Sequence, residues 1–84
     1  MAGKARSERP GSRQRLLTSA VTLFARQGYE ATSVSRIAAE GAAPMGYFYF
    51  HFPGGKEEIG VAALQYGAQR FAERLAEVLD RSTS

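Results

Sequence analysis

In the first half of the chain, apolar residues recur every three or four positions, which is the spacing of one face of an α-helix. The first such run predicts a helix over residues 13–27 with Ser12 as its cap. The helix should stop at Gly28, because glycine readily adopts the left-handed conformation found after many last turns. We expect Tyr29 to close the buried face from the loop. That face comprises Leu16, Leu17, Ala20, Val21 and Phe24.

Two short helices joined by a tight turn are predicted next. Ser33 is the expected N-cap of the first, which should end at Gly41, where a residue without Cβ relieves a turn between closely crossing helices. Pro44 suits the first turn of the second, which should run from Met45 to about Phe50. Together they form a helix-turn-helix. The inner side of its first helix comprises Val34, Ile37 and Ala38.

Residues 47–52 are crowded with aromatic side chains whose spacing fits two conformations. In a strand, Phe48, Phe50 and Phe52 would share one face. In a helix, Phe48 and Phe52 lie one turn apart and point into the core. Pro44 and the turn of small residues before the segment favour the helix.

A last, long helix is predicted from Lys56 to about Arg81, after residues 53–55 break the preceding one. One apolar stripe of this helix, placed to pack on the helix-turn-helix, comprises Ile59, Ala63 and Tyr66. A second stripe comprises Leu64, Ala68, Phe71, Leu75 and Val78. Nothing earlier in the chain is free to cover it, and an exposed apolar stripe usually marks a missing partner. The predicted fold is all-α: a three-helix bundle containing a helix-turn-helix, followed by a long fourth helix.

Composition limits the class of protein. The 84 residues suffice for one small domain, and without cysteine there is no disulfide and no thiolate metal site. The basic N-terminus lacks the apolar segment of a secretory signal, and no apolar run approaches the roughly 20 residues of a membrane span. We therefore expect a cytoplasmic protein that does not enter a membrane.

The charge is unevenly distributed. Residues 1–56 carry eight Lys or Arg against three Glu, a net +5, whereas residues 57–84 carry three Arg against five acidic residues, a net −2. A basic half suggests a polyanionic partner, although an ordinary solvated surface explains the charge equally well. We divide the chain into a disordered basic arm (1–11), a helix-turn-helix domain (12–56) and a long helix (57–84).

The combined pattern resembles the DNA-binding domain of TetR-type transcriptional repressors over about residues 13–66. The similar segments are LLTSAVTLFARQGYEATSVSRIA, a turn of small residues, GYFYFHF, and a final helix that starts with GKEEI. The resemblance implies that the long helix leads to a C-terminal effector and dimerisation domain, absent from these 84 residues. It further implies an operator-binding homodimer, a small-molecule effector for the absent domain, and no cofactor.

Base contacts are expected near the start of the second short helix, which would enter the major groove. Met45 can pack on a thymine methyl, Gly46 allows close backbone approach, and Tyr47 can hydrogen-bond a base edge. Members of the family often carry Lys or Arg at the position of Met45 and Ser or Thr at that of Pro44. These departures make the sequence preference unpredictable.

Phosphate contacts are expected around this helix. Thr32 and Ser33 combine hydroxyls with the free N–H groups of a helix start. The resemblance implies a phosphate contact for Tyr49, and less strongly for His51. Lys56 can meet a phosphate from the start of the last helix.

Other functions are less well supported. Residues 54–56 resemble part of a phosphate-binding loop. Phe50 and Glu57 stand where that loop requires Gly and Ser or Thr, so the interpretation fails. We find no nucleophile, metal cluster or carboxylate pair, and expect neither an enzyme nor a metal site. The competing hypothesis is a helical module that binds protein through the aromatic segment and the exposed stripe.

Overall fold

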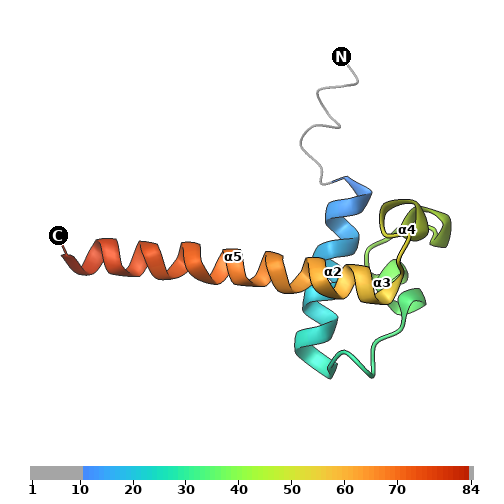
Figure 1. The fold of residues 1–84 in the computed structure, drawn as a ribbon, viewed down its shortest axis with the longest axis horizontal. Coiled ribbons are helices and arrows are strands. Elements are labelled where there is room, and N and C mark those ends of the chain that lie inside the picture. The colour runs from blue at the N-terminus through green and yellow to red at the C-terminus, as the bar shows by residue number, and fades with distance from the viewer. Residues whose placement is uncertain (1–10, 84) are drawn as a thin grey trace, which may run out of the picture.

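The computed structural model describes residues 11–83, which form four α-helices (Figure 1). They are α2 (Ser12–Gln27), α3 (Val34–Glu40), α4 (Met45–His51) and α5 (Lys56–Thr83). The helix-turn-helix and the long last helix are confirmed, and the strand alternative for the aromatic segment is wrong. The predicted arm at residues 1–11 lies outside the described residues except for Gly11.

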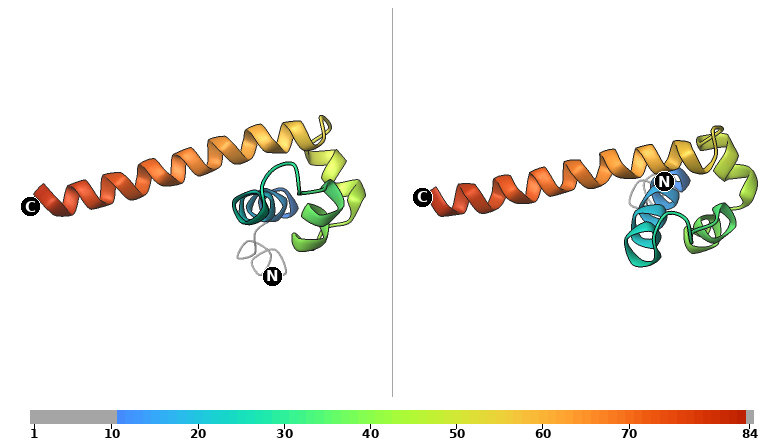
Figure 2. Two further views of the ribbon diagram at one scale, coloured as in Figure 1. Left: turned by 90° about the horizontal axis from the view of Figure 1, so that it is seen from below. Right: turned by 60° about the horizontal axis from the view of Figure 1, so that its bottom comes forward.

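The first three helices pack together, and α5 crosses α2 before projecting beyond them (Figures 1 and 2). In both views of Figure 2, the C-terminal half of α5 has no neighbouring helix. This arrangement gives the described chain extents of 48 × 43 × 19 Å. No helix in the described part of the chain is long and apolar enough to span a membrane.

The core draws on every helix. The predicted inner residues Phe48, Phe52 and Ile59 are completely buried, while Val21 and Phe24 only line the edge. Leu23, seven residues after Leu16, is also buried on this face and was not predicted. The buried apolar cluster comprises Leu16, Leu17, Ala20, Leu23, Ile37, Ala38, Ala43, Phe48, Phe52, Ile59 and Ala63.

The N-terminus of α2 differs from the prediction. Gly11 is the N-cap, and no side chain caps the helix. Ser12 is the first helical residue, and its hydroxyl lies 2.9 Å from Nε2 of His51. The C-terminus is as predicted: Gly28 has φ +92° and its N–H donates to the carbonyl of Phe24.

The turn between α3 and α4 is built against α2. A Cβ on Gly41 would lie 3.1 Å from the carbonyl oxygen of Arg15, so only glycine fits without displacing backbone. The Arg15 guanidinium reaches over the same turn, and its Nε donates to the carbonyl of Gly41 at 3.0 Å. A second nitrogen of this group donates to the carbonyl of Ala42, which has φ +54°. These contacts fix where α4 begins relative to α2.

The start of α5 is also anchored. Gly55 has φ +76°, and the Glu58 carboxylate accepts a hydrogen bond from the N–H of Gly54 at 2.6 Å. Tyr29 packs against Phe24 and beside Gly60, so it closes the edge of the core as predicted while staying partly exposed.

Beyond its first turns, α5 is exposed. The second apolar stripe remains uncovered by any residue of 11–83, as predicted. Its large side chains are Leu64, Phe71, Leu75 and Val78, with Val61 and Leu79 also exposed.

Replacing Gly41 with alanine should destabilise the domain, because the added methyl group meets backbone that cannot move independently of α2. We expect the free energy of unfolding to fall by roughly 1–3 kcal/mol in urea denaturation. Gly67→Ala is the matched control: nothing lies within 4 Å of its Cβ position in α5. There alanine should stabilise the helix by up to about 1 kcal/mol. Equal stability of the two variants would contradict the close contact at Gly41.

Candidate nucleic-acid interface

One side of α4 holds the helix in the core, and the opposite side faces outward. Phe48 and Phe52 are fully buried on the inner side. Successive helical residues are rotated by about 100°, which places Phe50 opposite that pair, with Gly46 and Tyr47 beside it. The exposed fractions agree, at 79% for Phe50 and 53% for Tyr47. We call this surface, made of Gly46, Tyr47 and Phe50, the outer face of α4.

The third predicted base contact, Met45, lies seven residues before Phe52 and therefore on the inner side of α4, but as the first residue of the helix it is still 40% exposed. Gly46 has open space at its Cβ position, so a ligand can approach the backbone closely there. The helix itself carries no acidic residue. Three predicted base-contacting residues are therefore accessible together at the N-terminal end of α4.

At the start of α3, only one of the two predicted phosphate contacts is accessible. Ser33 is exposed and caps the helix by accepting a hydrogen bond from the N–H of Arg36. Thr32 is 1% exposed, and its hydroxyl donates to the carbonyl of Gly28 at 2.7 Å. Its N–H donates to the carbonyl of Tyr29. The prediction for Thr32 is therefore corrected: it stabilises the loop before α3 instead of meeting phosphate.

Tyr49 is 49% exposed at the side of α4. Its ring packs edge-on against Phe48, with centroids 5.2 Å apart. Packing of the ring leaves the phenol accessible at the edge of the outer face, where the predicted phosphate contact needs it.

His51 and Lys56 already have partners within the fold. His51 is half-buried, and its hydrogen bond to Ser12 joins the end of α4 to the start of α2. The Nζ of Lys56 lies 4.3 Å from the centre of the Tyr29 ring, a cation–π contact. A side chain that serves only to contact phosphate would extend freely into solvent. Neither His51 nor Lys56 does so.

Two exposed arginines near these helices were not predicted as site residues. The Arg13 guanidinium lies 4.9 Å from the centre of the Phe52 ring. Arg36, on α3, forms an ion pair with Glu40 at 3.3 Å in which both side chains are about half exposed. Arg13 adds positive charge beside the end of α4, whereas the charge of Arg36 is balanced by Glu40 on the same helix. In residues 11–83 no three His, Cys, Asp or Glu side chains cluster in a way that could hold a metal ion.

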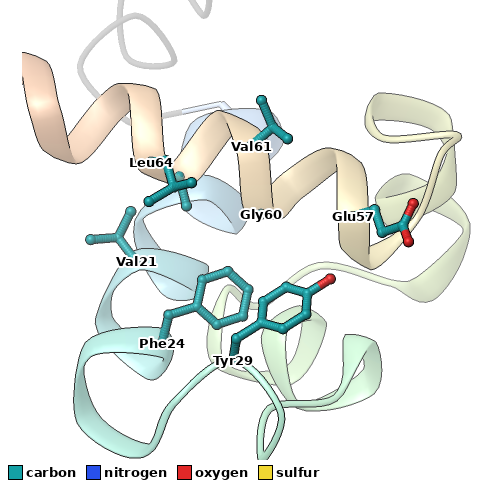
Figure 3. Close-up of a pocket in the computed structure, with 8 residues that line it drawn as sticks. Val21, Phe24, Tyr29, Glu57, Gly60, Val61 and Leu64 are labelled. Atoms are coloured by element: carbon teal, nitrogen blue, oxygen red, sulfur yellow. The ribbon is translucent and has the colours of Figure 1, made fainter.

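An apolar groove lies elsewhere, between α2 and α5 (Figure 3). The rings of Phe24 and Tyr29 lie side by side below α5, and Leu64 and Val61 line the other wall. No residue of α3 or α4 lines this groove. It is therefore separate from the outer face of α4.

Residues 16–63 match the family described as Bacterial regulatory proteins, tetR family. The chain belongs to this family. Three similar relatives are the HTH-type transcriptional regulator LmrA and the uncharacterized HTH-type transcriptional regulator YxaF, both of Bacillus subtilis (strain 168), and the uncharacterized HTH-type transcriptional regulator MT0206 of Mycobacterium tuberculosis (strain CDC 1551 / Oshkosh). No solved structure gives a significant match.

LmrA is 36% identical to the chain over 72 residues, which are 86% of this chain and 38% of LmrA. YxaF is 36% identical over 77 residues, covering 92% and 40% of the two chains. MT0206 is 33% identical over 67 residues, which are 80% of this chain and 34% of MT0206. The chain thus spans about two fifths of the length of the first two relatives. Its α3 and α4 form the helix-turn-helix of a tetR-family DNA-binding domain, and the names of these relatives are those of transcription regulators, not of enzymes.

Thr32→Val separates the structural role of Thr32 from a phosphate contact. Loss of the hydroxyl leaves the Gly28 carbonyl without its partner, so stability to urea should fall by about 1–3 kcal/mol. Its affinity for duplex DNA, measured where the domain is fully folded, should not change. Ser33→Ala should lose about 1 kcal/mol of stability from the missing cap and should also bind duplex DNA more weakly, with an unchanged salt slope because a hydroxyl neutralises no phosphate. Weaker duplex binding by folded Thr32→Val would reinstate the phosphate contact.

Proposed function

We propose that this chain is the operator-reading domain of a tetR-family repressor. The proposal rests on the two-sided structure of α4. Aromatic residues on its inner side are buried in the core, while its outer face is accessible and free of acidic residues. A short helix held in this way can lie in the major groove without rearrangement. In bacteria such a regulator acts in the cytoplasm, where the chromosome lies.

In this proposal Met45, Gly46 and Tyr47 contact base edges, and Ser33, Tyr49 and Lys56 contact phosphates. The exposure of Ser33 at the start of α3 and of Tyr49 at the side of α4 supports these two contacts directly. Lys56 keeps its contact with Tyr29 and offers its remaining ammonium protons to phosphate. His51 contributes by holding α4 to α2; when Ser12 donates to Nε2, the imidazole proton resides on Nδ1 and is available to a phosphate.

Repression would require two copies of the domain, bound to half-sites about 34–36 Å apart along the duplex. The uncovered apolar stripe of α5 and the greater length of the relatives support a further domain that dimerises and binds a small effector. Effector binding would shift α5 and thereby change the separation of the two copies of α4.

Salt titration tests the proposal against the alternative of a protein-binding module. Duplex binding should weaken steeply between about 50 and 200 mM salt, because each neutralised phosphate releases counterions. An affinity for duplex that is indifferent to salt would contradict DNA reading.

Single variants test the division of roles. Lys56→Ala should weaken binding to all duplexes alike and lower the salt slope by about 1, whereas Tyr47→Ala should change the preference among sequences. Arg74→Ala is the matched control, since it removes one cation from the exposed part of α5 far from α4. Equal effects of the Lys56 and Arg74 variants on affinity and slope would show that only net charge matters.

A further inference from the structure

The outer face of α4 contains an exposed phenyl ring that none of the proposed contacts uses. Phe50 has the largest exposed fraction of the large apolar residues in the described chain, 79%. It lies on the outer face of α4, the surface that meets DNA in the proposed function. A phenyl ring can neither donate a hydrogen bond to a phosphate nor carry charge, so solvation and charge do not account for it.

The major groove offers an apolar ring one specific partner. The C5 methyl of thymine projects into this groove, whereas cytosine, adenine and guanine present only polar groups or bare ring edges. Contact with that methyl would remove ring surface from water. An exposed phenyl on the outer face of a major-groove helix therefore fits recognition of thymine.

The surroundings of Phe50 provide space for a methyl group. A shallow open depression on this surface is lined by Ser12, Gly46, Tyr47, Phe50 and His51. Gly46 precedes Phe50 by one helical turn, so the two lie on the same side of α4. Nothing lies within 4 Å of the Cβ position of Gly46, which leaves room for a base edge beside the Phe50 ring.

The ring is also supported from behind. Its centroid lies 5.1 Å from that of the His51 imidazole, with the rings nearly perpendicular at 78°. The imidazole is in turn held by the hydroxyl of Ser12 at 2.9 Å. A ring supported in this way loses less conformational freedom on binding than a free side chain does.

We infer that Phe50 is a specificity-determining residue that reads a thymine C5 methyl in each half-site, with Gly46 leaving the space for it. The inference rests on the proposed DNA-reading function. In this arrangement His51 and Ser12 act as positioning residues for the ring.

Deoxyuridine tests this contact because it lacks only the methyl group of thymidine. The probe is a duplex selected from a random pool by the wild-type chain, with each thymine replaced singly by deoxyuridine. At one thymine per half-site, the replacement should weaken wild-type binding about three- to fivefold, the effect of losing one buried apolar carbon. Phe50→Ala should bind the unmodified duplex more weakly and should be insensitive to deoxyuridine at that same position.

Two further variants sharpen the test. Phe50→Leu keeps an apolar side chain and should retain part of the discrimination, whereas Gly46→Ala fills the space and should discriminate against thymine at that position. Both changes are on open surface, and cooperative unfolding with stability not below that of the wild type would show intact folds.

Two results would overturn the inference. One is uniform weakening by Phe50→Ala with no thymine at which wild type and variant respond differently to deoxyuridine, which would place the ring on sugar or phosphate backbone. The other is unchanged binding by Phe50→Ala. Failure of the wild-type chain to bind any duplex in a salt-dependent manner would instead refute the proposed function itself, and the inference with it.

Discussion

The position of α4 depends on how closely the turn after α3 approaches α2. Glycine at position 41 lets the turn backbone lie against the carbonyl of Arg15, and the Arg15 guanidinium holds the carbonyls of the turn from the same side. The buried Ser19 hydroxyl adds a hydrogen bond to the carbonyl of Ile37 at 2.9 Å. These polar contacts place the end of α3 on α2, and α4 begins only four residues after Gly41. A small shift at the turn would therefore move the whole outer face.

Because α4 has only seven residues, it cannot be stable on its own and depends on tertiary packing. Phe48 and Phe52 supply that packing from its inner side, and the Ser12–His51 hydrogen bond secures its last turn to α2. The residues of the outer face are therefore not needed to pack α4 against the core. This separation explains how aromatic residues on one short helix serve both stability and recognition.

Local signals in the sequence were enough to predict the helices and the direction of their main side chains. Ser33, Gly41 and Pro44 marked the ends of α3 and the start of α4, and the one-turn spacing of Phe48 and Phe52 identified the inner side. The pairings of residues distant in sequence were not predictable in this way. Ser12 and His51 are 39 residues apart, and nothing local indicates that they meet.

The two adjacent hydroxyl residues before α3 show a different limit. The sequence alone allows either Thr32 or Ser33 to face a ligand. The path of the loop decides between them, because it buries the Thr32 side chain. Phe50, by contrast, was predictable: once Phe48 and Phe52 were assigned to the core, helical geometry required Phe50 to point outward. The contact of Lys56 with Tyr29 depends on how α5 crosses α2, which no local pattern encodes.

An NMR titration of the ¹⁵N-labelled chain with duplex DNA tests most directly whether the outer face of α4 is the binding surface. We predict amide shift changes concentrated at residues 45–51, at Ser33 and near Ser12, growing weaker as salt is raised. Residues 68–82 of α5 should remain unchanged. Shift changes concentrated along the exposed stripe of α5, with residues 45–51 unaffected, would contradict DNA binding through the outer face of α4.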